Sequence, residues 1–148
     1  MTIYCTPNFC KQIAELAKNK SYASVLADVC DYFKDKNIHE LHITKAVIRT
    51  SPSIYSINKY RIINSLSNKG KSSSYRCICG CYVKNDLIIL DTIYPKTGSE
   101  GIDNLSKEQY TNIATSIKDA VSVNDLAILD IGNQQITKPA ANKKGPHF

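Results

Sequence analysis

Residues 75–94 read YRCICGCYVKNDLIILDTIY, and this stretch decides the fold. Its two halves, Tyr75–Val83 and Leu87–Tyr94, are rich in Ile, Val, Tyr and Cys, which favour strands. The short link over residues 84–86 suits an antiparallel hairpin. A further strand-like run, Ile57–Ser65, comes earlier, and residues 66–74 between the runs form a loop rich in Ser, Lys and Gly. The middle of the chain therefore predicts a small, mainly antiparallel sheet.

Helical patterns lie on the N-terminal side of this sheet. Residues 1–5 fit a short edge strand, and Thr6-Pro7 supplies an N-cap followed by proline at the first helical position. A second helix is predicted from Ser21 to about Asn37, whereas residues 38–56 show no regular pattern. The two apolar stripes comprise Phe9, Ile13, Leu16 and Ala17, and then Tyr22, Val25, Leu26, Val29 and Phe33. Such stripes predict a pair of helices that packs on the sheet.

Another helix is predicted after the sheet. Ser106 and Gln109 form a capping-box pattern, and apolar residues follow it at helical spacing. Leu126–Ile131 has the composition of one more strand, and residues 138–148 resemble a frayed tail. We therefore predict an α+β fold in which two N-terminal helices pack on a small twisted, mainly antiparallel sheet, with a C-terminal helix. This domain would span residues 1–120, and residues 121–148 would form a C-terminal extension with a possible added strand and a flexible tail.

Length and composition narrow the class of protein. The 148 residues suit one domain, and 43% hydrophobic with 22% charged residues allows a packed core without disulfides or metal. No run approaches the roughly 20 apolar residues of a membrane span, and the start of the chain lacks the pattern of a secretion signal. We therefore expect a cytoplasmic protein with no membrane partner.

The positive charge is concentrated in one region. The net charge is +6, and residues 41–85 contain eight Lys and Arg with no Asp or Glu, so the rest of the chain carries 6 − 8 = −2. A region of one sign attracts polyanions, and nucleic acid is the leading candidate. A solvated lysine-rich surface is the alternative reading of the same charges.

Six cysteines are present, and in a cytosolic chain we expect them to be reduced. Cys77, Cys79 and Cys81 alternate along one strand, which puts their sulfurs on one side. A zinc site with His39 or His42 is one interpretation, but alternate strand residues lie roughly 6–7 Å apart and converge poorly on one ion. We therefore expect core packing, no metal ion and no cofactor. A role of His42 as a general base stays open.

Four segments follow one another in a characteristic order: KYRIIN at 59–64, KGKSSSYR at 69–76, LIILDTIYPK at 87–96 and LSKE at 105–108. Together they resemble the core of the RelE/HigB/ParE superfamily of bacterial toxins. Family members typically have a glycine- and lysine-rich loop before an aromatic-Arg pair, and an aliphatic strand that ends in Tyr-x-Lys. Ser73 and Ser74 stand where the family has glycines. The resemblance implies a RelE-like fold and a toxin that cuts messenger RNA on the ribosome, held inactive by a cognate antitoxin.

RNA cleavage by the 2′-hydroxyl requires a stabilised pentacovalent phosphate and a proton for the leaving 5′-oxygen. Arg61 and Arg76 are predicted to clamp the scissile phosphate, because a guanidinium matches phosphate oxygens in a two-point fork. Lys71 would hold a flanking phosphate or transfer a proton, and Tyr94 would stack on a base or donate to the phosphate. The predicted catalytic set is Arg61, Lys71, Arg76 and Tyr94, and the predicted RNA-binding set is Lys59, Lys69, Lys84 and Lys96.

Two other functions fit the same sequence. ParE-like members of the superfamily bind DNA gyrase as protein inhibitors and cut no RNA. A nucleic-acid-binding regulator without catalysis would also use the basic segment. The set of cationic side chains with Tyr94 favours the nuclease, because an RNA-cutting site needs these groups and an inhibitor does not.

Overall fold

One sheet forms the centre of the molecule. The computed structural model describes residues 1–42, 47–51, 55–67, 74–96 and 104–139. Over these residues the sheet has seven strands in the order β2-β3-β4-β5-β1-β6-β7, and β1 runs parallel to β5 while the other pairs are antiparallel. The strands are β1 (Thr2–Cys5), β2 (Val47–Ser51), β3 (Tyr55–Ile62), β4 (Tyr75–Tyr82), β5 (Leu87–Pro95), β6 (Ala127–Asp130) and β7 (Gln135–Thr137).

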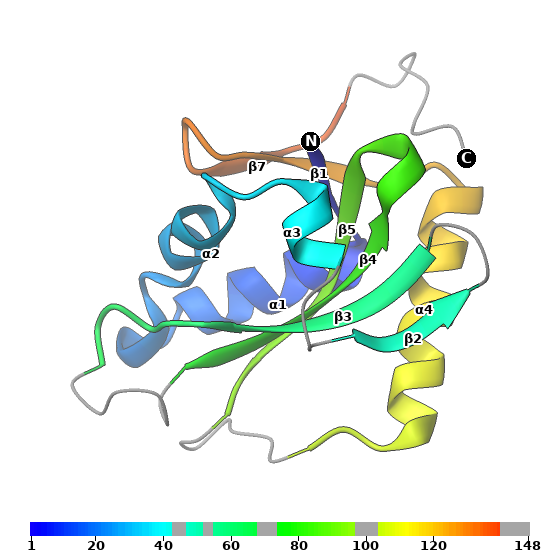
Figure 1. Ribbon diagram of the computed structural model, residues 1–148. Coiled ribbons are helices and arrows are strands. Elements are labelled where there is room, and N and C mark those ends of the chain that lie inside the picture. The colour runs from blue at the N-terminus through cyan, green and yellow to red at the C-terminus, as the bar shows by residue number, and fades with distance from the viewer. Residues whose placement is uncertain (43–46, 52–54, 68–73, 97–103, 140–148) are drawn as a thin grey trace.

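Helices cover both faces of this sheet (Figure 1). The helices are α1 (Pro7–Ala17), α2 (Val25–Phe33), α3 (Ile38–His42) and α4 (Lys107–Ser122), with 3₁₀ turns at Lys20–Tyr22 and Val83–Asn85. Helices α1, α2 and α3 share one buried cluster with the side chains of Tyr60, Cys77 and Leu90, and we call this side the α1–α3 face. Helix α4 packs on Ile57, Ile78 and Ile89 from the opposite side, which we call the α4 face.

The predicted fold is wrong in its architecture. The class is α+β, but the sheet is large and mixed, and three helices precede β2 where a pair was expected. The helix after the sheet is internal, because β6 and β7 follow it. The chain therefore does not have the predicted RelE-like arrangement of a helix pair, a small sheet and a C-terminal helix. The difference arises because β1 and β6 extend the sheet beyond β5, and local sequence patterns do not reveal which strands pair.

Several local predictions are confirmed. The Thr6 hydroxyl accepts a hydrogen bond from the Phe9 amide at 3.2 Å, and Pro7 begins α1. Ser106 and Gln109 form both bonds of a capping box at the start of α4. The β4–β5 hairpin has the predicted antiparallel pairing and turns at Asp86, whose φ is 51°.

Other boundaries differ from the prediction. The second helix begins at Val25, because a 3₁₀ turn capped by Asn19 occupies residues 20–22. Strand β3 ends at Ile62, before the predicted end at Ser65. The chain leaves the sheet there and contacts α2 and the turn before it. The Asn64 side-chain amide donates to the Ser21 carbonyl at 2.9 Å, and the Ser65 backbone N–H donates to the Asp28 carboxylate at 3.2 Å.

The strand predicted at Leu126–Ile131 is present as β6, and it has an unpredicted partner in β7. Asp130 accepts hydrogen bonds from the backbone and the side chain of Asn133, which closes the turn between them. Strand β1 was predicted as an edge strand, but it lies between β5 and β6. Among the described residues, none of the helices has both the length and the apolar character required to cross a bilayer.

Candidate active site

Three predicted catalytic residues lie in one row across the sheet. Arg61 of β3 is the register partner of Arg76 of β4, and Arg76 is the register partner of Tyr94 of β5. Residues directly opposite in antiparallel strands point to the same face with their Cβ atoms about 4.5–5.5 Å apart. The row formed by Arg61, Arg76 and Tyr94, called the arginine row below, is therefore about 10 Å long across two strand spacings.

The arginine row lies on the α4 face. Side chains alternate between faces along a strand, so Arg61 shares its face with Ile57, and Arg76 shares its face with Ile78. Both isoleucines belong to the cluster that packs against α4. Arg61 is nevertheless exposed and Arg76 half-buried, so the helix leaves this end of the face open to solvent.

Arg76 is held in place by its neighbours. One terminal nitrogen, Nη1, donates to the Ser74 hydroxyl at 2.8 Å and to the Tyr75 carbonyl at 3.3 Å. Burial and the adjacent charge of Arg61 lower the pKa of Arg76. Neither arginine forms an ion pair with an acid in the described ranges. Among the described residues neither arginine has an acidic partner, and Nε and Nη2 of Arg76 form no hydrogen bond, so the pair is suited to an anion.

Tyr94 is the third member of the row, and its side chain is 4% exposed. Its hydroxyl is buried and has no hydrogen-bond partner among the described residues. Burial raises the pKa of Tyr94 to about 12, so the phenol is protonated at neutral pH. A protonated phenol can donate a hydrogen bond, but this hydroxyl has no exposed surface and meets a ligand oxygen only when the covering side chains move. A ring this deeply buried does not offer its face to a base, so the stacking role considered for Tyr94 is not supported.

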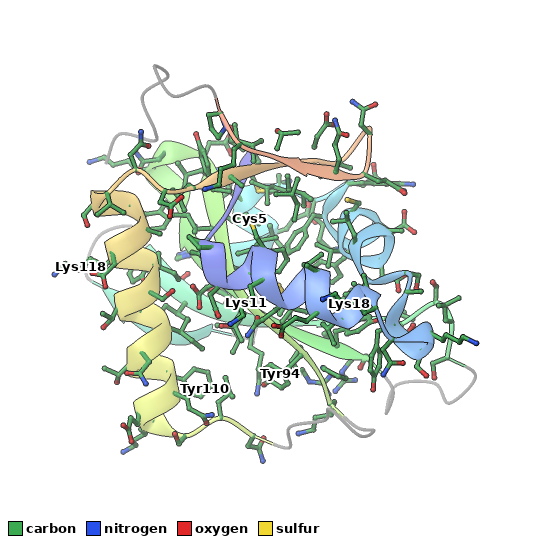
Figure 2. The ribbon with its side chains drawn as sticks, turned by 180° about the vertical axis from the view of Figure 1, so that it is seen from behind. Cys5, Lys11, Lys18, Tyr94, Tyr110 and Lys118 are labelled. Atoms are coloured by element: carbon green, nitrogen blue, oxygen red, sulfur yellow. The ribbon has the colours of Figure 1, made fainter. Side chains whose placement is uncertain are left out.

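Two hollows adjoin Tyr94. Figure 2 shows Tyr94 in the region between α1 and the start of α4. One, of about 200 Å³, lies beside α4, and the other, of about 150 Å³, lies beside α1; Gln12 and Tyr94 line both. We call the first the amide pocket. Its lining residues are Gln12, Thr92, Tyr94, Leu105, Gln109, Asn112 and Ile113.

A larger hollow lies elsewhere. It has a volume of about 520 Å³ and lies between the start of α1 and the second half of α4. Its charged lining residues are Asp119 and Asp125. An acidic hollow repels a polyanion, so size does not identify the site here.

The chain matches no protein-family model, no curated protein and no solved structure. Membership of the toxin superfamily is therefore not shown. The chemistry of the site has to follow from the geometry of its own side chains.

The predicted lysines are spread over the molecule. Lys59 is half-buried on the α4 face, opposite Ile78 and two positions from Arg61. Lys96 follows β5 at the end of the sheet that carries the arginine row, and its amide donates to the Ser74 carbonyl at 3.1 Å. Lys84 lies in the β4–β5 turn, at the other end of β4 from Arg76, and so does not belong to this site. Lys69 and Lys71 lie outside the described residues.

The predicted histidine alternatives lie away from the row. His42 is in α3, and its Nδ1 is 3.0 Å from the Ser56 hydroxyl on the α1–α3 face. The sheet therefore separates His42 from Arg76, and His42 is not placed to act as a base there. His39 lies in the same short helix.

The alternating cysteines lie on the α1–α3 face. Cys77, Cys79 and Cys81 are each 0% exposed and belong to its buried cluster, as predicted. Burial is the main cause that raises the pKa of the Cys77 thiol, which keeps it protonated. Within the described part of the chain, no three His, Cys, Asp or Glu side chains are arranged to hold a metal ion.

The sequence analysis missed three residues at this site. Ser74, which fixes Arg76, was noted only as a replacement for a family glycine. Gln109 was identified only for its capping role, and Gln12 has no signal in the sequence because it stands outside the apolar stripe of its helix. Gln12 and Gln109 are far apart in the sequence, and only the tertiary structure brings their side-chain amides near the row.

Proposed function

We propose that this chain is an endoribonuclease that cuts messenger RNA at the ribosome and acts as the toxin of a toxin–antitoxin pair. The observation that carries the proposal is the register of Arg61, Arg76 and Tyr94 across three neighbouring strands. The fold prediction was wrong, so the proposal takes no support from architecture. It rests on the row and on the acid-free basic segment that contains two of its members.

The row supplies donors for the negative charge that develops in the transition state of RNA cleavage. The 2′-oxygen attacks the adjacent phosphorus, its proton passes to solvent water, the bond to the 5′-oxygen breaks, and the 5′-oxygen takes up a proton from water. Negative charge accumulates on the non-bridging oxygens, where the two guanidinium groups are suited to donate hydrogen bonds, as is the Tyr94 phenol once the covering side chains move. Donors fixed before the reaction contribute most, and the bonds from Arg76 to Ser74 and Tyr75 fix one of them.

The partners follow from the same charges. Single-stranded messenger RNA would lie along the open end of the α4 face, and a cytoplasmic location would give access to the ribosome. An antitoxin would block this surface with acidic or apolar side chains, because an exposed cationic site is neutralised most directly by a segment of opposite charge.

The test is to map RNA ends in cells after induced expression. The wild-type chain should produce new 5′-hydroxyl ends within translated codons. Arg76→Ala should reduce them by roughly 100-fold or more, because removal of one preorganised donor to a transition-state anion costs about 10²–10³ in rate. Arg76→Lys should retain part of the activity, since it keeps the charge but loses the fork.

Lys118→Ala is the matched control, because Lys118 is exposed on α4 and outside the predicted site (Figure 2). It removes one positive charge and should leave cleavage unchanged. Undiminished cleavage by a folded Arg76→Ala variant would refute the assignment of the row. DNA damage without new RNA ends would instead support the gyrase inhibitor. If neither DNA damage nor new RNA ends appear, the nucleic-acid-binding regulator is the function that remains.

A further inference from the structure

The amide pocket has a composition that phosphate binding does not explain. Among the described residues its lining contains no cation and no acid, and Leu105 and Ile113 supply apolar walls. Moving a phosphate into such a pocket would cost much free energy, because no positive side chain would compensate its lost hydration. The pocket is also smaller than the roughly 300–1,000 Å³ typical of sites for drug-sized ligands. A small, neutral and largely apolar group fits it better.

The glutamines of the pocket are fixed in one orientation. Gln12 Oε1 accepts a hydrogen bond from the Ile93 amide at 2.8 Å. Gln109 Oε1 accepts one from the Ser106 amide at 2.7 Å. A backbone N–H can only donate, so in both residues the oxygen is the atom turned to the backbone, with one lone pair still free, and the amide nitrogen is the donor of the group. Neither nitrogen has a hydrogen-bond partner within the described ranges, so both glutamines are left with NH₂ donors.

The pocket is therefore rich in donors. Tyr94 also lines the pocket, but its hydroxyl is buried and so adds no accessible donor to the two amide nitrogens. The Thr92 hydroxyl donates to Asp91 at 2.8 Å, so this donor is already used. A ligand that uses the two amide nitrogens presents hydrogen-bond acceptors at its edge, and Leu105 and Ile113 favour an apolar body.

We propose that the amide pocket binds a nucleobase next to the phosphate held by the arginine row, and that Gln12 and Gln109 select a base edge with two acceptors. This inference rests on the proposed function, since Tyr94 belongs both to the row and to the pocket. Guanine presents the neighbouring acceptors O6 and N7, whereas adenine presents N7 beside the N6 donor. The pocket therefore favours guanine, and an amide donor facing the adenine amino group would be left unpaired.

The proposal can be tested by calorimetric titration of the full-length chain with nucleoside monophosphates. GMP should bind about 10-fold more tightly than AMP, because a matched two-acceptor edge discriminates by about 1–3 kcal/mol. IMP keeps both O6 and N7 and should bind like GMP. The analogue 7-deaza-GMP lacks one acceptor and should bind several-fold more weakly, in line with the loss of one hydrogen bond.

Two substitutions change the donors and keep the fold. Gln12→Glu and Gln109→Glu retain the oxygen that accepts from Ile93 or Ser106 but replace the donor nitrogen by a second acceptor. Glutamate is also a normal partner in a capping box. Each variant should lose the preference for GMP over AMP. Gln135→Glu on β7 adds the same negative charge at an exposed position and should preserve it.

AMP binding as tight as GMP binding in the wild-type chain, or a GMP preference that survives both substitutions, would overturn the pocket assignment. These results are independent of the cleavage assay. RNA cleavage without a preference for GMP over AMP would support the proposed nuclease and refute the proposed base pocket. A preference for GMP without new 5′-hydroxyl RNA ends would support a nucleotide-binding pocket and refute the nuclease.

Discussion

The two faces of the sheet differ most clearly along β3. On the α1–α3 face, Asn58 is 0% and Tyr60 2% exposed, and burial continues to the last residue of the strand. On the α4 face, Ile57 is 1% exposed, Lys59 is half-buried and Arg61 is exposed. Three helices cover the first face, whereas one helix covers only part of the second. The same strands therefore build a core on one side and, on the other, an open end where unpaired cations are tolerated.

The buried polar groups also differ in their hydrogen bonding. Tyr60 donates to the Leu41 carbonyl at 2.6 Å, and Asn58 donates to the same carbonyl at 2.9 Å. Tyr94 on the α4 face has a buried hydroxyl with no such partner in the described ranges. Tyr60 and Asn58 are therefore satisfied within the protein, whereas the buried hydroxyls of Tyr75 on the same face and of Tyr94 on the α4 face have no partner among the described residues.

The largest effect on stability is expected from the core of the α1–α3 face. Phe33 is 1% exposed, and its ring packs against Tyr32 and Tyr60 with centroid distances of 4.8 and 6.1 Å. Phe33→Ala should lower the free energy of unfolding by about 3–5 kcal/mol, because it removes a buried ring and leaves a cavity. Urea denaturation measures this. A loss below about 1 kcal/mol would show that this face is not the main source of stability.

An alkaline titration should destabilise both faces. Burial raises the pKa of Tyr60, Tyr75 and Tyr94, the last to about 12, while in the unfolded chain these phenols have a pKa near 10. Below pH 10 the phenols are neutral in both states, and their contribution is fully present. Between about pH 10 and 12 only the unfolded state ionises, so stability should fall by about 1.4 kcal/mol per pH unit for each such phenol.

The alkaline effect is measured by urea denaturation together with the tyrosinate absorbance of the native protein. Tyrosinate absorbance from all nine tyrosines before unfolding would contradict the burial of these phenols. Replacement of Tyr60 by Phe should make the loss of stability with pH less steep, because one phenol with a raised pKa is then absent.

A matched pair of substitutions compares the two faces directly. Tyr60→Phe removes a hydroxyl that donates to Leu41 and should cost about 0.5–1.5 kcal/mol. Tyr94→Phe removes a buried hydroxyl without a described partner and should leave stability unchanged or slightly raise it, while RNA cleavage falls. Thermal unfolding and RNA-end mapping on both variants provide the measurements. Equal destabilisation by the two substitutions would remove the distinction between the hydroxyls.

The smallest effect on stability is expected from Arg61→Ala. Arg61 is exposed, and its charge contributes to the lowered pKa of Arg76. Its removal should change the free energy of unfolding by no more than about 0.5 kcal/mol, as is usual for surface positions, with relief of repulsion favouring the variant. Cleavage should nevertheless fall strongly. A destabilisation above about 1 kcal/mol would indicate a structural role for Arg61 that the described contacts do not contain.

Local features were the most predictable part of this molecule. The Thr6 cap, the Ser106–Gln109 capping box and the β4–β5 hairpin depend on residues within a few positions of one another, and each is present. The alternation of Cys77, Cys79 and Cys81 likewise predicted their shared burial. The two arginines of the row could also be selected, because cations in a segment without acids have no obvious structural partner.

The sequence by itself determined the helix caps, the hairpin, the concentration of positive charge and the residue types at the candidate site. Only the tertiary structure decided that β1 and β6 extend the sheet, that Arg61, Arg76 and Tyr94 stand in one row, and that Gln12 and Tyr94 line the same two hollows. The physical reason is that alternation assigns side chains to a face but does not select a partner strand. Strand order and the extent to which α4 covers its face depend on contacts between distant residues, and these contacts create the open site.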